Sequence, residues 1–152
     1  MLTTPTGATP MTSPEQAGRA ASTASLSVPA FPDQLGLLRA MVRAAADHYG
    51  LSMDALADLV IAVDEAATTL VSHARRSSTL VCTFDAVTSP SRLRVILAAT
   101  TSSPVDASTS SFGWLVLRTL VDDVMLEQTP AAAPTGDRSV TITLERALPA
   151  SS

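Results

Sequence analysis

The sequence contains no lysine, one cysteine and few aromatic residues, and each shortage excludes a kind of site. All ten basic residues are arginine, which excludes a Schiff-base lysine and a lysine-containing phosphate loop. The single Cys82 excludes an intramolecular disulfide and a cysteine metal cluster. Aromatic residues make up 3% of the chain, which leaves few rings on which nucleic-acid bases could stack.

Clustered positive charge and long apolar runs are also missing. The net charge is -4, whereas a DNA- or RNA-binding surface needs clustered cations. No apolar run approaches the ~20 residues that cross a bilayer, and the first residues lack the apolar block of a signal peptide. We therefore expect a cytoplasmic protein that contacts neither nucleic acid nor membrane directly.

The 152 residues, of which 46% are hydrophobic, are enough for one domain with an aliphatic core. Residues 1–23 are rich in Thr, Ser, Pro, Gly and Ala, and such a segment buries too little apolar surface to offset its chain entropy. We expect a disordered tail over 1–23, a folded domain over 24–148 and fraying over 149–152.

The longest helical pattern covers residues 51–76, where Ser52 is suited to cap the first turn. One stripe at helical spacing is apolar and comprises Leu56, Val60, Val63, Ala67, Leu70 and Ala74. A second stripe is polar in all but one position and comprises Asp58, Ala62, Glu65, Thr69, Ser72 and Arg76. This second face either is solvated, as in an ordinary amphipathic helix, or lines a site.

A short strand over 24–30 and a helix that starts at Pro32 and Asp33 and ends at Gly50 precede this helix. The expected buried stripe of that first helix is Leu35, Leu38, Met41, Val42 and Ala45. Arg39 and Arg43 lie one turn apart on its outside. They form either a solvated face or a cationic patch for an acidic partner.

The second half of the chain is richer in strands. Strands are predicted over 79–87, 92–99, 125–129 and 138–146, a binding loop over 100–111 and a helix over 112–124. Cys82 is expected to be buried, and neither His48 nor His73 is expected to bind metal or act in catalysis. The order β-α-α-β-β-loop-α-β-β predicts an α+β two-layer sandwich, with a mostly antiparallel mixed sheet and three helices on one face.

This element order, together with AVDEAATTLVSHA in the second helix, resembles the GHKL (Bergerat) ATP-binding fold. Over residues 25–148 it is similar to the small anti-sigma factor/serine kinases of the RsbW and SpoIIAB type. FGWLVLRTLVDDV resembles the actinobacterial anti-sigma F proteins of the UsfX/RsbW group. The resemblance implies a homodimer that keeps a sigma factor from RNA polymerase. It also implies competition by an anti-anti-sigma factor, which active members phosphorylate on serine with ATP and magnesium.

The resemblance assigns candidate nucleotide residues one at a time. Glu65 matches the catalytic Glu of the family's Glu-x-x-x-Asn motif, and Thr69 stands where the magnesium-binding Asn belongs. A hydroxyl offers magnesium one neutral oxygen in place of an amide carbonyl. Thr69 is therefore a candidate cofactor and metal ligand with weakened affinity.

The glycine motifs of the family are altered. Its Asp-x-Gly-x-Gly corresponds to LAATTSSPVDAS, where Asp106 is the nearby acid at a different spacing, and its Gly-x-Gly retains Gly113 alone. The Gly-Thr of the last strand falls near Thr141, with the Gly replaced. Only glycine lets backbone N–H groups approach a phosphate closely in such turns. Gly113 and Thr141 complete the candidate cofactor-binding set.

Arg39 matches the family arginine that contacts both the sigma factor and the anti-anti-sigma factor, and Arg43 lies beside it. We therefore predict an anti-sigma factor that binds a sigma factor by protein–protein contact and has degenerate nucleotide motifs. Two alternatives stay open. One is an active ATP- and magnesium-dependent serine kinase, and the other is an interaction domain unrelated to sigma factors.

Overall fold

The computed structural model describes residues 23–88, 91–105, 112–130 and 136–149. Its elements are β1 (Thr23–Pro29), the 3₁₀ helix η1 (Pro32–Gln34), α2 (Leu35–His48), α3 (Met53–His73), β2 (Thr79–Val87), β3 (Arg92–Thr101), α4 (Phe112–Leu120), β4 (Asp123–Pro130) and β5 (Arg138–Ala147). This is the predicted order with one added 3₁₀ turn. The tail expected to be disordered lies outside the described residues except for Thr23, as does the 106–111 part of the expected binding loop.

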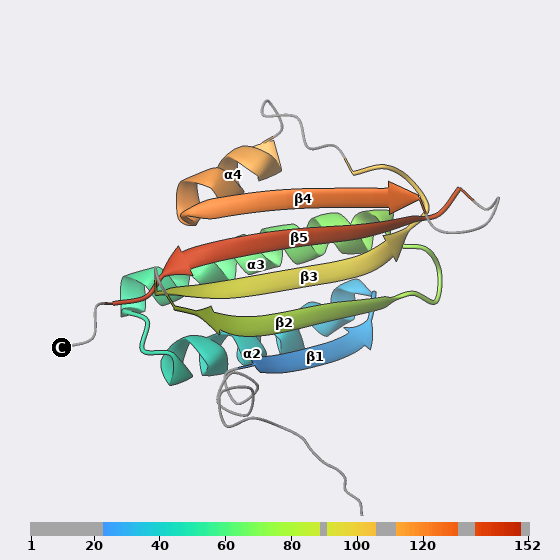
Figure 1. Ribbon diagram of the computed structural model, residues 1–152. Coiled ribbons are helices and arrows are strands. Elements are labelled where there is room, and N and C mark those ends of the chain that lie inside the picture. The colour runs from blue at the N-terminus through green and yellow to red at the C-terminus, as the bar shows by residue number, and fades with distance from the viewer. Residues whose placement is uncertain (1–22, 89–90, 106–111, 131–135, 150–152) are drawn as a thin grey trace, which may run out of the picture.

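The five strands form one sheet in the order β1-β2-β3-β5-β4. Because the chain passes from β3 through α4 to the edge strand β4, the last strand β5 returns between β3 and β4 (Figure 1). The predicted α+β class is confirmed. The predicted mixed sheet is wrong, because every pair of neighbouring strands that the structure describes is antiparallel.

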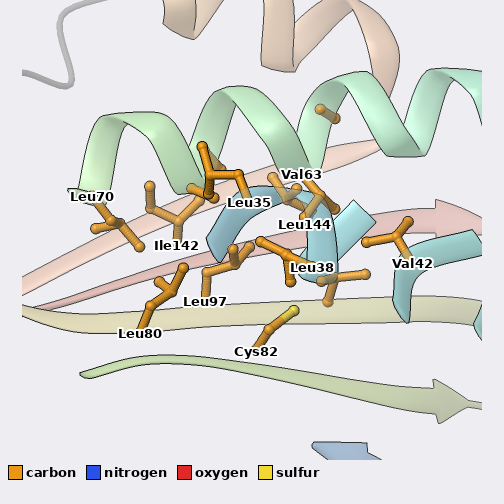
Figure 2. Packing of buried hydrophobic residues seen from close by; sticks show 14 of the residues in the cluster. Leu35, Leu38, Val42, Val63, Leu70, Leu80, Cys82, Leu97, Ile142 and Leu144 are labelled. Atoms are coloured by element: carbon orange, nitrogen blue, oxygen red, sulfur yellow. The ribbon is translucent and has the colours of Figure 1, made fainter. Parts of the chain in front are cut away.

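One face of the sheet carries the core. Alternate side chains of the three central strands are at most 1% exposed; they are Leu80, Cys82, Phe84, Leu93, Val95, Leu97, Val140, Ile142 and Leu144. Figure 2 shows several of them packed against Leu38, Val63 and Leu70 of the helices. The residues between them, such as Thr83, Ile96 and Thr141, lie on the opposite face and are partly exposed. The predicted burial of Cys82 is confirmed.

Helix α3 packs on the sheet with a face that is rotated from the predicted one. Its buried residues are Ala55, Leu59, Ala62, Val63, Ala66, Ala67 and Leu70. Leu56 and Val60, which were expected in the core, are only partly buried, whereas Ala62 of the expected polar stripe is fully buried. Small alanine side chains allow the helix to lie close to the sheet, so they take core positions that hydrophobicity alone assigns to larger residues.

The ends of the helices are set by both local and long-range contacts. The Ala55 N–H donates to Ser52 Oγ at 3.1 Å, so the predicted cap is confirmed. At the other end Ala74 adopts an extended conformation and bridges to Thr101, which ends α3 at His73 instead of residue 76. Helix α4 likewise ends at Leu120 instead of residue 124, because strand pairing with β5 begins at Asp123.

Within the described parts of the chain, no helix combines the length and the apolar character that a membrane crossing requires.

Candidate functional site

A cavity of about 180 Å³ lies between α3, α4 and the sheet. It is lined by Glu65, Thr69 and His73 of α3, Gly113, Trp114 and Leu117 of α4, Ile142 of β5, and Val105. Three of the candidate nucleotide residues, Glu65, Thr69 and Gly113, therefore line the same cavity. Their roles in binding or catalysis stay predictions.

Helical spacing brings Glu65, Thr69 and His73 to one face of α3, because residues four apart lie one above the other. The Thr69 hydroxyl donates to the Glu65 backbone oxygen at 3.0 Å. His73 Nδ1 lies 2.9 Å from the Thr69 backbone oxygen. Both polar side chains are thus tied to the preceding turn of their own helix.

The Glu65 carboxylate reaches α4 at Gly113. Its Oε2 atom lies 2.7 Å from the position that a Cβ atom on residue 113 would occupy. Gly113 is in the first turn of α4, where N–H groups without a helical acceptor favour a negative charge. The protein's own carboxylate therefore occupies the end of α4 to which an incoming anion would be attracted.

Thr141 is not brought to this cavity. Side chains of β5 alternate, so buried Val140 and Ile142 face the helices and Thr141 faces the other side of the sheet. The adjacent Ile142 lines the cavity instead. Asp106 and Ser111, which lie in the altered glycine motifs, fall outside the described residues.

The described lining of the cavity offers a triphosphate little volume and neither Arg nor Lys. Ligand sites usually enclose about 300–1,000 Å³, which exceeds the 180 Å³ found here. The described lining contributes one carboxylate and neither Arg nor Lys, whereas phosphate recognition relies on cations or free N–H groups. In the described part of the chain no group of three His, Cys, Asp or Glu residues is placed to hold a metal ion.

The second candidate site is the outer surface of α2 and α3. Arg39 Nε lies 2.8 Å from Asp64 Oδ1, and these side chains are 43% and 35% exposed. Side-on contact through Nε leaves the terminal amino groups of the guanidinium for another acceptor. Arg43 is one turn further along α2 and is exposed. The structure thus places Arg39 and Arg43 on one accessible surface.

Two residues of these sites were missed in the sequence. His73 was set aside, although its spacing of four residues from Thr69 and eight from Glu65 was a usable signal. Asp64 was missed because its partner Arg39 is 25 residues away on another helix. Spacing within one helix carries no information about such a pair.

Comparison with known proteins identifies the domain. Residues 28–136 match the family described as histidine kinase-like ATPase domain. The chain belongs to this family. As a member of the histidine kinase-like ATPase domain family, it contains Arg39, Glu65, Thr69 and Gly113 within the matched stretch, whereas Thr141 follows that stretch.

Two curated relatives of this ATPase-like domain have the same name. The anti-sigma-F factors RsbW of Mycobacterium tuberculosis strains CDC 1551 / Oshkosh and ATCC 25618 / H37Rv are each 37% identical to it over 101 residues. The aligned part is 65% of this chain and 58% of each relative. The chain thus spans a little over half the length of these relatives.

Proposed function

We propose that this protein is an anti-sigma factor that sequesters an alternative sigma factor by direct protein–protein contact. The similarity to two proteins named anti-sigma-F factor supports this assignment. The structural observation that carries it is the Arg39 guanidinium, which Asp64 holds by its Nε edge on the outer surface of the helices.

The geometry of this pair suits recognition of an acidic partner. Asp64 reduces the number of conformations open to the Arg39 side chain, so less entropy is lost when a partner carboxylate binds. The terminal amino groups that remain offer a planar fork that matches a carboxylate. We further propose that an anti-anti-sigma factor competes for this surface, and that the protein acts in the cytoplasm as a homodimer.

We also propose that ATP and magnesium bind weakly, so that partner binding does not depend on catalysis. The small cavity beside Glu65 and Thr69 supports this, as does the absence of a cation from its described lining. The Thr69 hydroxyl donates its hydrogen to the Glu65 backbone oxygen, so it could offer a metal ion one neutral oxygen only. This hydroxyl is a weaker magnesium ligand than the amide carbonyl that the family resemblance places at this position.

An active serine kinase is the second candidate function. The observation in its favour is that Glu65 and Thr69 face one cavity in a member of an ATPase-like family. In that function Glu65 would act as the base and Thr69 would contact the metal ion. The stabilisation of the folded protein by ATP and magnesium distinguishes the two candidates, because only a kinase needs tight nucleotide binding.

Binding to the F-type sigma factor of the source organism, measured by isothermal titration calorimetry, tests the proposed function. The Arg39→Glu substitution places two carboxylates together at the α2–α3 surface. We expect affinity to fall at least about tenfold, since loss of a charged interface contact typically costs 2–5 kcal/mol. Arg76→Glu changes the same charge at an exposed position beyond the end of α3 and is the matched control.

Two results would contradict the proposed function. A wild-type protein that binds no sigma factor removes the assignment itself. Equal affinity of wild type, Arg39→Ala and Arg39→Glu, with unchanged circular dichroism spectra, removes Arg39 from the binding surface. The Ala variant guards against a loss that arises only from repulsion between the new Glu and Asp64.

A further inference from the structure

The polar side chains that α3 contributes to the cavity beside Gly113 present hydrogen-bond acceptors. The Thr69 hydroxyl donates its hydrogen to the Glu65 backbone oxygen, so its oxygen lone pairs remain. His73 Nδ1 lies 2.9 Å from the Thr69 backbone oxygen. Because a carbonyl oxygen only accepts, Nδ1 carries the hydrogen, and Nε2 of the neutral imidazole is left as an acceptor. The Glu65 carboxylate also only accepts.

The charge of the Glu65 carboxylate is only partly compensated. In the part of the chain that the structure describes, this carboxylate is in no ion pair and accepts no hydrogen bond. The first turn of α4, which it meets at Gly113, is equivalent to about half a positive charge. Part of the negative charge of Glu65 is therefore left for a ligand.

The rest of the lining is apolar, and one of its residues is held at both backbone polar atoms. Val105, Leu117 and Ile142 supply aliphatic wall, and Trp114 supplies an aromatic ring. Gln128 Oε1 accepts from the Val105 N–H at 2.9 Å, and Gln128 Nε2 donates to the Val105 oxygen at 3.0 Å. Val105 is thus in place before a ligand binds, and little entropy is lost in ordering it.

The volume of the cavity and the spread of its acceptors restrict the kind of ligand. An apolar cavity of about 150 Å³ holds one benzene molecule, so the 180 Å³ found here admits one six-membered ring with a small polar group. Glu65 and His73 are eight residues apart, or about 12 Å along the helix axis. A single metal ion could not contact both, which favours a ligand of molecular size.

We propose that this cavity is a binding site for a small planar organic cation, an amidinium or guanidinium group joined to one ring or a short apolar chain. The N–H groups of the cation pair side by side with the two Glu65 oxygens. Its apolar part lies against Leu117 and Ile142. This site goes beyond the proposed function, because it requires neither a sigma factor nor a nucleotide.

The fluorescence of Trp114 tests the proposal, because this residue is the one tryptophan of the chain and lines the cavity. Benzamidine, an amidinium group on a single ring, is the probe. We expect saturable binding to the full-length protein with a dissociation constant of about 1 mM or tighter, which a ligand of this size can reach. Benzoate has the same ring and the opposite charge and should bind at least about tenfold more weakly. Absence of saturable benzamidine binding, or equal binding of benzoate, would overturn the proposal.

A charge variant tests the role of the carboxylate. Glu65→Gln keeps the shape of the side chain and removes its charge. We expect it to weaken benzamidine binding at least about tenfold, since hydrogen bonds to charged groups are the strong ones. Glu127→Gln is the matched control, because Glu127 is an exposed carboxylate of β4 outside the cavity, and it should bind like wild type. Equal binding by Glu65→Gln and wild type, with unchanged circular dichroism spectra, would contradict the assigned cation partner.

A second measurement locates the bound probe. In methyl-labelled protein, benzamidine should shift the signals of Val105, Leu117 and Ile142, which line the cavity. The signals of Ile61 and Leu115, which are exposed and do not line it, should stay in place. Shifts confined to Ile61 and Leu115 would place the cation elsewhere and remove the site.

Adenosine separates a cation site from a site for a nucleotide base. Its ring carries N–H groups without a positive charge, so it should displace benzamidine less readily than unlabelled benzamidine displaces itself. Adenosine that binds as tightly as benzamidine, or more tightly, would assign the cavity to a neutral base and overturn the proposal. No sigma factor is present in these titrations, so their failure leaves the proposed function standing.

Discussion

At the scale of single residues, Glu65 and Gly113 form a coupled pair. An alanine at 113 adds helix propensity, up to about 1 kcal/mol. It also displaces the Glu65 carboxylate, which stands 2.7 Å from the new Cβ position, and removes about 0.3–1 kcal/mol of favourable charge at the start of α4. In wild type the two effects oppose each other, so Gly113→Ala should change the free energy of unfolding by less than about 0.5 kcal/mol.

The same substitution made in a Glu65→Ala protein should stabilise more, because no carboxylate is displaced. Urea unfolding of the four proteins in this double-mutant cycle measures the coupling, which we expect to be about 0.5–1 kcal/mol. Additive effects would mean that the Glu65 carboxylate does not interact with the first turn of α4. In that case the Glu65 carboxylate does not fill the anion-attracting end of α4.

The buried thiol of Cys82 makes the free energy of unfolding depend on pH in the alkaline range. Burial raises the pKa of its thiol from 9.0 to about 12. Between these values the unfolded chain loses the thiol proton and the folded chain keeps it, so the free energy of unfolding falls as pH rises. Relative to Cys82→Ala, wild type should lose about 1.4 kcal/mol between pH 8 and pH 10. If the free energy of unfolding changed with pH in the same way in both proteins, the Cys82 thiol would be accessible to water in the folded state.

At the scale of elements, the start of α3 depends on one hydroxyl. Ser52→Ala removes the oxygen that accepts from the Ala55 N–H and should lower the free energy of unfolding by about 1 kcal/mol. Ser72→Ala makes the same chemical change within α3, where the hydroxyl only bonds back to Thr68, and should cost less than about 0.5 kcal/mol. Thermal unfolding measures the loss of stability in each variant. Equal losses would show that the Ser52 hydroxyl does not stabilise α3 as a cap.

Element boundaries were predictable where local signals decided them. The Ser52 cap was recognised one residue before α3, and the apolar run of β2 matched Thr79–Val87 in full. Helix α4 was predicted too long because Val121 and Val124 continue its apolar pattern. Pairing of Val124 with Leu144 of β5 takes precedence there, and such a pairing between distant segments leaves no local trace.

At the scale of the whole molecule, contacts within one helix were predictable and contacts between helices were not. The period of α3 correctly indicated that Glu65 and Thr69 share a face. The alternation along β5 could have shown that Thr141 points away from the cavity that these two residues line. The Arg39–Asp64 pair depends on how α2 and α3 are packed side by side. That packing is set by the core as a whole and by no short stretch of sequence.

Ligand-linked stability of the whole protein decides between an anti-sigma factor with a weakened nucleotide site and an active kinase. A ligand that binds only the folded state stabilises it by RT ln(1 + [L]/Kd). We expect 1 mM ATP with magnesium to raise the free energy of unfolding by less than about 0.5 kcal/mol, the value for a Kd of 1 mM or weaker. The reasons are the small volume of the cavity beside Gly113 and the lack of Arg or Lys in its described lining. Magnesium chloride alone at matched ionic strength is the control.

A kinase with micromolar affinity would behave differently in the same measurement. At 100 times its Kd, ATP would stabilise the folded state by about 2.7 kcal/mol, and Glu65→Gln would keep that binding while abolishing phosphate transfer to the anti-anti-sigma factor. An increase of that size in the free energy of unfolding, together with transfer of labelled phosphate by wild type, would contradict the proposal of weak nucleotide binding. It would leave the Arg39 surface in place, because Arg39 does not line the cavity.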